Sequence, residues 1–280
     1  MNVGKNSIKI LRRRFFMKKV SVVLMMMFFL AIALVGCASP EADSVLDKIQ
    51  EAGTMVVGTS ADYPPYEYVD ESGNFAGFDI ELMTEIAKRM NVELEWTDMP
   101  FDSLIAAVQE GKIDLSISCF NYSEERDEKV DFSDAYYTSE DAFLVAEDFA
   151  GTITNAEDVA NFKIGVQSGT VQDEWVTTEL IEAGLMEESN LSRYERVDQA
   201  AMDLQAGRIE VIVADSVPAQ ALMGQFGGFK IVFEDMLYTG PINIVLPEGD
   251  SELQERVNSI IAELQSEGFI DDLAVKYFSD

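Results

Sequence analysis

Four loops that follow predicted strands carry the side chains best suited to chemistry. They offer one arginine, several hydroxyl and amide groups, carboxylates and aromatic rings. Because ligands bind beyond the carboxyl ends of the strands in open parallel sheets, these groups are expected to face one site. A guanidinium holds an anionic group through paired charge-assisted hydrogen bonds, so the arginine favours a carboxylate ligand. The loops comprise residues 58–66, 116–126, 167–172 and 214–215.

Histidine is absent from the whole sequence. Its absence removes the usual general base, the commonest zinc ligand and every Ser-His or Cys-His nucleophile pair. The sequence also has no P-loop and no GxGxxG motif. These observations favour a binding protein over an enzyme, and we expect neither a metal nor a cofactor.

Strands that alternate with helices must position the loops, and this order is typical of an α/β fold with largely parallel sheets. The first series predicts a helix that Ser44 caps and Gly53 stops, helices at 78–90 and 102–110, and strands at 54–59, 92–96 and 113–118. The second predicts helices at 170–183 and 197–206 and strands at 163–166, around Arg193, and at 211–214. The chain then continues with a strand at 242–246 and amphipathic helices at 251–267 and 271–277.

The two series also share short stretches of sequence. Residues 109–114 match residues 205–210, and Val57-Gly58-Thr59 resembles Ile164-Gly165-Val166. Ancestral duplication explains this likeness, and so does the general form of a helix-glycine-strand junction. Both explanations predict two similar lobes. We expect lobe 1 to comprise residues 44–138 plus 240–280 and lobe 2 residues 139–239, with hinge crossings near 138–141 and 238–240.

The N-terminus has the layout of a secretory signal, because seven basic residues precede an uncharged run at 20–35. The run ends in Leu34-Val35-Gly36-Cys37, which looks like the bacterial lipobox. We therefore expect a signal peptide at 1–36, a lipidated Cys37 and a tether at 37–43, which would anchor the protein to a lipid bilayer outside the cytoplasm. The alternative is an ordinary signal peptide with a chance cysteine. Met17 is a second candidate for the true start in both cases.

Acidic residues dominate the remaining chain. Removing residues 1–36 leaves 13 of the 20 lysines and arginines against 51 acidic residues, a formal charge of −38. Such a field repels nucleic acid. With Cys37 lipidated, Cys119 has no partner for an intramolecular disulfide, so stability must come from the core. We expect a monomer that does not bind nucleic acid.

The four loops, together with residues 77–82, resemble the family 3 solute-binding proteins that serve polar amino acid ABC importers. The likeness runs from about Asp47 to the C-terminus. It implies the two-lobed type II fold of periplasmic binding proteins, in which two parallel-rich sheets flanked by helices are joined by two hinge crossings. It also implies a free amino acid as ligand and an ABC permease with its ATPase as partners.

The resemblance assigns the two charged ligand contacts. Arg126, in Ser123-Glu124-Glu125-Arg126, matches the arginine that clamps the α-carboxylate, and Asp215 matches the ligand of the α-ammonium. The competing interpretations are a surface arginine paired with Glu124 or Glu125, and an aspartate that caps the next helix.

Aromatic and polar positions follow from the same resemblance. Tyr63 and Phe101 match the two rings that sandwich the ligand side chain, which suits a cationic or planar group, although aromatic residues are commonly core. Ser118 and Thr170 match polar positions at the cleft.

Several matched positions depart from the family pattern. Cys119, Asn121 and Val171 replace serine or threonine, which leaves side-chain selectivity open. Ser60 stands where basic amino acid binders often have an acid, and Asp62 could substitute for it. A cationic amino acid is favoured on this basis, with glutamine or another uncharged polar amino acid as the alternative.

Two other functions are compatible with the sequence. The first is an enzyme like the periplasmic cyclohexadienyl dehydratases, with Asp62 or Asp215 as general acid. The second is an amino acid sensor lipoprotein that feeds no importer.

Overall fold

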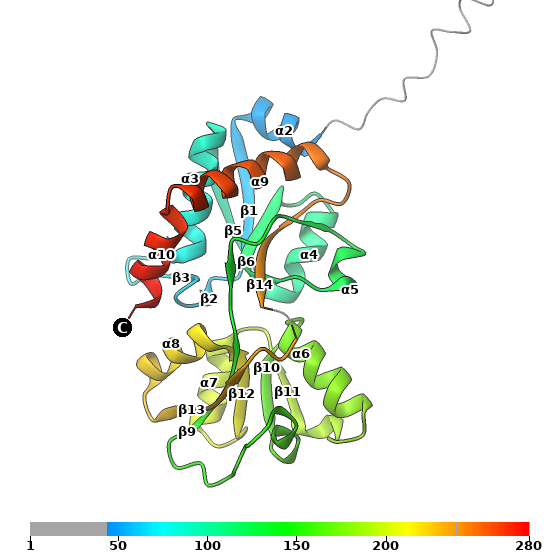
Figure 1. Cartoon of the computed structure of the whole chain (residues 1–280), viewed down its shortest axis with the longest axis vertical. Helices are drawn as coiled ribbons and strands as arrows, with labels where there is room; N and C mark the ends of the chain where they lie inside the picture. The colour runs from blue at the N-terminus through cyan, green and yellow to red at the C-terminus, as the bar shows by residue number, and fades with distance from the viewer. Residues whose placement is uncertain (1–43, 239, 280) are drawn as a thin grey trace, which may run out of the picture. The chain divides into compact units, whose positions relative to one another are not determined.

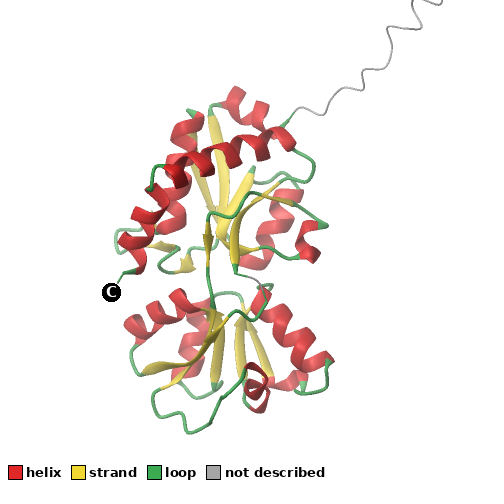
Figure 2. Cartoon of the chain, viewed as in Figure 1, coloured by secondary structure: helices red, strands yellow, loops and turns green. Residues whose placement is uncertain are grey.

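The computed structural model describes residues 44–238 and 240–279, which form two mixed sheets flanked by helices (Figures 1 and 2). The predicted signal peptide, lipidation site and tether lie outside the described residues. Within the described ranges, no helix is long and apolar enough to cross a membrane.

The first sheet has the strand order β5-β1-β6-β14-β7, and β8 also pairs with β14. Strands β5, β1 and β6 are parallel, as predicted, whereas β14 runs antiparallel to β6, β7 and β8. The strands are β1 (Thr54–Thr59), β5 (Glu93–Asp98), β6 (Leu115–Asn121), β7 (Asp131–Phe132), β8 (Tyr137–Thr138) and β14 (Pro241–Leu246).

Six helices accompany the strands of this sheet within the described residues. Ser44 caps the first through its side chain, which accepts a hydrogen bond from the backbone N–H of Leu46. Helix α3 buries Phe78, Leu82 and Met90 on the face that the four-residue spacing predicts. The two C-terminal helices pack against α3 (Figure 1). The helices are α2 (Val45–Ala52), α3 (Phe78–Met90), α4 (Phe101–Gln109), α5 (Glu124–Asp127), α9 (Ser251–Ser266) and α10 (Phe269–Phe278).

The second sheet has the strand order β11-β10-β12-β9-β13. Its predicted strands β11, β10 and β12 are parallel, and the antiparallel β9 and β13 complete it. The strands are β9 (Asp141–Ala146), β10 (Ile164–Gln167), β11 (Leu191–Tyr194), β12 (Val211–Asp215) and β13 (Phe229–Asp235). The helical segments are η1 (Ala156–Asn161), α6 (Val171–Trp175), its π-helical continuation η2 (Val176–Glu182), η3 (Glu188–Asn190), α7 (Val197–Gln205) and α8 (Ser216–Phe226).

A small antiparallel sheet with the order β2-β3-β4 leads from β1 into α3. It contains β2 (Asp62–Tyr63), β3 (Glu67–Val69) and β4 (Phe75–Ala76), with a cis peptide bond between Pro64 and Pro65. The chain turns from β4 into α3 at Gly77, whose φ is 129°. A Cβ at this glycine would lie 2.1 Å from the carbonyl oxygen of Tyr66, so no other residue fits.

The repeated sequence segments pack in equivalent ways in the two sheets. A Cβ at Gly58 in β1 would lie 2.3 Å from Cδ1 of Ile113, and a Cβ at Gly165 in β10 would lie 2.4 Å from Cδ1 of Ile209. In each sheet, the missing side chain of the strand glycine leaves room for an isoleucine. That isoleucine lies two residues after the glycine that ends the preceding helix. Duplication and a shared packing requirement both account for this likeness.

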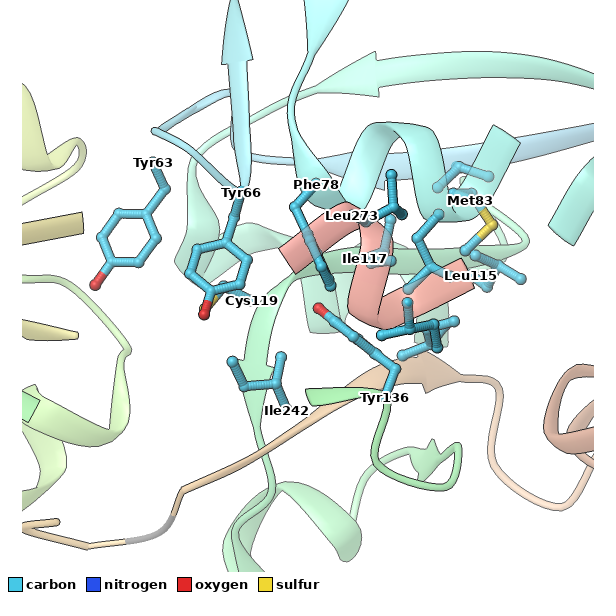
Figure 3. Close-up of a cluster of buried hydrophobic side chains, with 14 of the residues drawn as sticks. Tyr63, Tyr66, Phe78, Met83, Leu115, Ile117, Cys119, Tyr136, Ile242 and Leu273 are labelled. Carbon is cyan, nitrogen blue, oxygen red and sulfur yellow. The ribbon is translucent and has the colours of Figure 1, made fainter. Parts of the chain in front are cut away.

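The chain passes between the two large sheets twice, from β8 to β9 and from β13 to β14. On the side of the first sheet, aromatic rings form part of the largest buried cluster (Figure 3). The Phe78 ring centroid lies 5.8 Å from that of Tyr66 and 6.1 Å from that of Tyr136. These rings fix the first turn of α3 beside β6.

Candidate ligand-binding site

A narrow cavity lies where loops from the two large sheets meet. Its free volume of about 10 Å³ is close to that of one water molecule, so an amino acid requires the walls to separate. The lining contains nine of the eleven predicted ligand-binding residues, and Asp62 and Asn121 are not among them. The lining residues are Ser60, Tyr63, Glu67, Phe101, Ser118, Cys119, Arg126, Gln167, Thr170, Val171, Gln172 and Asp215.

A wider groove of about 650 Å³ adjoins the cavity. Phe101, Arg126 and Thr170 line both spaces, so they separate the cavity from the groove. The remaining groove residues come mainly from α4, α5, α6 and η2. The groove is therefore the wide side from which a ligand can approach.

Arg126 is buried in the cavity wall, with 7% of its surface exposed. Its Nη1 donates to the carbonyl oxygen of Asn121 at 2.6 Å, and its Nη2 donates to that of Gly169 at 2.7 Å. The guanidinium carbon lies 5.5 Å from the ring centroid of Phe101. Burial lowers the pKa of Arg126 to about 10, which keeps it charged at neutral pH.

The surface-arginine interpretation does not describe Arg126. Glu125 pairs with Lys129 at 2.7 Å instead, and among the described residues no carboxylate forms an ion pair with Arg126. The carboxylates of Glu174, Glu125 and Asp215 stabilise the charge of Arg126 without forming an ion pair with it. Because an arginine has five N–H donors, donors remain for an anionic ligand group.

Asp215 lies at the end of β12 and is buried, with 4% of its surface exposed. Its Oδ2 accepts hydrogen bonds from the Tyr63 hydroxyl at 2.8 Å and from Gln172 Nε2 at 3.3 Å. Burial, followed by the charge of nearby Asp141, raises the pKa of Asp215 to about 7. The side chain makes no capping hydrogen bond to α8, so it faces the cavity rather than the helix.

Tyr63 connects the small sheet to Asp215. Besides donating to the Asp215 carboxylate, its hydroxyl accepts a hydrogen bond from the Asp215 N–H at 3.0 Å. Phe101, the other predicted sandwich ring, stacks on Phe120 with ring centroids 4.5 Å apart. Both rings line the cavity together with Asp215.

Glu67 is an acidic cavity residue that the sequence analysis missed. Only 1% of its surface is exposed, and its Oε1 accepts a hydrogen bond from the Ser118 hydroxyl at 2.7 Å. Its Oε2 is buried without a hydrogen-bond donor among the described residues. The cavity therefore holds one basic and two acidic side chains, namely Arg126, Glu67 and Asp215.

Comparisons with known proteins identify the family of this chain. The profile of bacterial extracellular solute-binding proteins, family 3, matches residues 55–280. This chain belongs to that family. It is 30% identical over 252 residues to the L-cystine-binding protein of Escherichia coli K12, covering 89% of this chain and 92% of the relative. It is 34% identical over 230 residues to the L-arginine-binding protein of Pseudomonas aeruginosa, covering 80% and 87%.

A solved structure extends the likeness to three dimensions. An ancestral arginine-binding protein bound to arginine matches with a TM-score of 0.75 and 35% identity, covering 81% of this chain and 99% of that chain. The type II fold predicted for a family 3 solute-binding protein is thereby confirmed.

In this family 3 protein, most of the other predicted polar side chains form hydrogen bonds with the protein's own loops. The Ser118 hydroxyl accepts from the Ser60 N–H at 3.0 Å, and the Thr170 side chain caps α6 by accepting from the Asp173 N–H at 3.2 Å. Val171 follows as the first residue of α6. Asn121 is outside the lining and presents its carbonyl oxygen to Arg126.

Asp62 does not line the cavity, although its predicted role was to replace an acid at position 60. Its carboxylate accepts from the Ser60 hydroxyl at 2.7 Å and from the Val197 N–H at the start of α7 at 2.8 Å. Nη1 of Arg196 lies 3.4 Å from Oδ1 of Asp62. Burial raises the pKa of Asp62 to about 6. The Asp62 side chain therefore links the small sheet to α7 and does not face the cavity.

Gln167 and Gln172 are further cavity residues that the sequence analysis missed. Gln172 Nε2 donates to Asp141 at 2.7 Å as well as to Asp215, so it orients both acids. The two glutamines are the first and last residues of the loop at 167–172, where the strand-end rule could have indicated them.

Proposed function

We propose that this chain captures a cationic amino acid between two lobes and presents it to an ABC importer, rather than catalysing a reaction. Lobe 1 comprises residues 44–138 and 240–280, and lobe 2 comprises residues 139–239. The observation that carries the proposal is the charge arrangement of the cavity, in which Arg126 faces the acidic Glu67 and Asp215. An α-carboxylate, an α-ammonium and a side-chain cation are its complement.

In this proposal Arg126 binds the α-carboxylate and Asp215 the α-ammonium. Arg126 lies in α5 beside the first sheet, and Asp215 ends a strand of the second. A zwitterion therefore bridges the lobes and compensates both buried charges. An amine or a carboxylic acid alone compensates only one of them.

Glu67 supports a cationic side chain as the third feature of the ligand. Its buried Oε2 needs a donor, which a guanidinium or an ammonium supplies. The rings of Tyr63 and Phe101 line the same cavity and favour a planar cation. Relatives that bind L-arginine agree with this choice. Glutamine uses the same zwitterion contacts and would leave Glu67 without a cation.

Ligand exchange in this proposal requires hinge opening at the two crossings. In the present arrangement contacts between the lobes close the cavity, including Arg126 to Gly169 and Asp62 to Val197. A ligand that touches both lobes favours the closed state through its differential affinity. Amino acid capture is thus coupled to a shape that a permease can distinguish.

A ligand screen by thermal shift tests the proposed function. The twenty amino acids, ornithine and citrulline are compared at about a thousandfold excess over the expected Kd, where a binder stabilises the protein by about 4 kcal/mol. L-arginine, L-lysine or L-ornithine is expected to give the largest shift. No shift with any amino acid would contradict the proposal, and an aromatic product formed from prephenate or arogenate would instead indicate a dehydratase.

Anchoring through Cys37 is a further part of the proposal. Cys37→Ser, or globomycin treatment, is expected to leave an unlipidated precursor or a mislocalised protein. Mass spectrometry of the N-terminal peptide and cell fractionation measure the outcome. Wild-type protein recovered from culture supernatant without fatty acid on Cys37 would rule out the anchor.

A further inference from the structure

Glu67 has a buried neighbour, Asp79, that takes no part in the contacts proposed so far. Both carboxyl groups are almost fully buried, with 1% of Glu67 and 0% of Asp79 exposed. Among the described residues, neither forms an ion pair with a lysine or arginine, although Arg126 lines the same cavity as Glu67. Two buried acids without a counter-ion need another source of compensation.

Asp79 is held rigidly in the first turn of α3. Its Oδ2 accepts from the Cys119 N–H at 2.8 Å, and the Tyr136 hydroxyl lies 2.9 Å from both carboxylate oxygens. The Asp79 N–H donates to the carbonyl oxygen of Tyr66 at 2.9 Å, in the close turn that Gly77 permits. Its position beside Glu67 is therefore fixed by the backbone.

Glu67 lines the ligand cavity, and β6 holds its carboxyl group and that of Asp79 through consecutive residues. Ser118 satisfies Oε1, and Oε2 meets no donor among the described residues. Ser118 and Cys119 are consecutive residues of β6, so their hydrogen bonds to Glu67 and to Asp79 bring the two carboxyl groups into one buried cluster. Two carboxyl groups in such a cluster cannot both ionise without strong repulsion. Burial and the charge of Asp79 raise the pKa of Glu67 well above its usual range, and burial raises the pKa of Asp79 to about 7.

We propose that Glu67 and Asp79 share one proton in the ligand-free protein, and that a cationic ligand side chain reaching Glu67 displaces this proton into solvent. The inference rests on the proposed function, because it needs a cation beside Glu67. Asp79 acts as a positioning residue that controls the charge of Glu67. When arginine binds, its guanidinium thus replaces the proton as the positive charge beside the two buried carboxyl groups.

Arg126 lines the same cavity as Glu67, and the other titratable groups around the pair are acids or neutral hydroxyl and thiol groups. Arg126 bonds to the carbonyl oxygens of Asn121 and Gly169 rather than to Glu67, and the remaining groups supply no positive charge, so the surroundings favour retention of the proton. Asp215 binds the α-ammonium of every amino acid, so its titration affects arginine and the isosteric, uncharged citrulline alike. The groups that interact with the pair are Asp62 from β2, Tyr66 before β3, Cys119 from β6 and Tyr136 between β7 and β8. Asp141 from β9 and Asp215 from β12 act on Cys119.

The sign of the pH dependence follows from this exchange. Below the titration range of the pair, arginine must displace a proton, so its affinity rises with pH by up to about tenfold per unit for each proton released. Citrulline displaces no proton from Glu67. The ratio of the citrulline Kd to the arginine Kd is therefore expected to increase with pH until Glu67 and Asp79 have together lost their proton.

Calorimetry of the purified full chain at about pH 6.5, in two buffers with different ionisation enthalpies, counts the released protons. Arginine is expected to release about 0.5–1 proton more than citrulline, because only arginine brings a charge to Glu67. Equal proton release by the two ligands would overturn the inference while leaving amino acid binding intact. If neither ligand binds and no amino acid shifts the melting temperature, the proposed function fails first.

Asp79→Asn gives an independent test. An asparagine amide can donate to Glu67, so Glu67 stays ionised without a shared proton. The difference in proton release between arginine and citrulline is expected to disappear, and their Kd ratio should lose its pH dependence. Glu71→Gln, at an exposed residue after β3, is the matched control. A persistent difference in Asp79→Asn would overturn the role of Asp79, and if this variant does not fold, the wild-type proton count decides.

Discussion

Replacing Arg126 with lysine is expected to weaken amino acid binding by about 2–5 kcal/mol, at least about 30-fold in Kd. The guanidinium of Arg126 is buried and held by two carbonyl oxygens, so its remaining donors point in fixed directions. A lysine ammonium is a point charge on a flexible stem and cannot reproduce a bidentate carboxylate contact. Calorimetry with L-arginine measures the loss.

Arg208→Lys is the control for this variant. Arg208 is exposed and pairs with Asp203 away from the cavity, so its replacement should leave Kd unchanged. Circular dichroism of both variants should remain native. Unchanged affinity in Arg126→Lys would remove Arg126 from the site and undo the assignment of the α-carboxylate.

Asp215→Asn is expected to reduce affinity by a similar amount, about 2–5 kcal/mol, because the α-ammonium loses its buried anionic partner. The fold should not lose stability in parallel. An asparagine oxygen can still accept from the Tyr63 hydroxyl, and the variant no longer buries a charge whose ionisation is costly. Affinity by calorimetry and melting temperature without ligand are measured together.

The pH dependence of stability gives a second test of Asp215. The folded-state pKa of Asp215 is raised from 3.8 to about 7, so ionisation between these values is less favourable in the folded than in the unfolded protein. Its contribution to stability therefore declines as pH rises from about 4 to 7. Asp215→Asn should reduce this decline, whereas Asp102→Asn, in the groove, should not. Equal affinity in Asp215→Asn and wild type would exclude Asp215 as the ammonium contact.

The sequence predicted best those elements whose burial follows a regular period. Helix α3 begins and ends where its four-residue spacing indicates, and β1 lies between a glycine stop and a polar loop. The strands β2, β3 and β4 have only two or three residues, which is too short for an alternating pattern. Helix α8 contains a proline and a glycine and lacks a clear polar face, so it was also missed.

The antiparallel strands β9 and β13 depend on long-range pairing. Residues 141–145 are all buried, so β9 has no alternation, and its partners β12 and β13 lie far along the chain. The parallel strands were easier to predict because helices separate them at regular intervals. The mixed character of both sheets thus results from contacts that local sequence does not encode.

The cavity lining could be predicted largely from the position of loops after strands. This rule brought Ser118, Arg126 and Asp215 to one place even though they lie on different elements. It could not distinguish Asp62 from Glu67. In the β2-β3 hairpin, Asp62 faces α7 and Glu67 faces the cavity, and only the register of the hairpin decides between them.

Small-angle scattering of the protein with matched ligands tests most directly whether a zwitterion closes the two lobes. L-arginine, which carries both the carboxylate for Arg126 and the ammonium for Asp215, is expected to reduce the radius of gyration. Its decarboxylated amine, agmatine, and its deaminated acid each lack one contact and should not reduce it at equal concentration. If agmatine closes the protein as L-arginine does, Arg126 is not the carboxylate anchor, and the chain captures amines rather than amino acids.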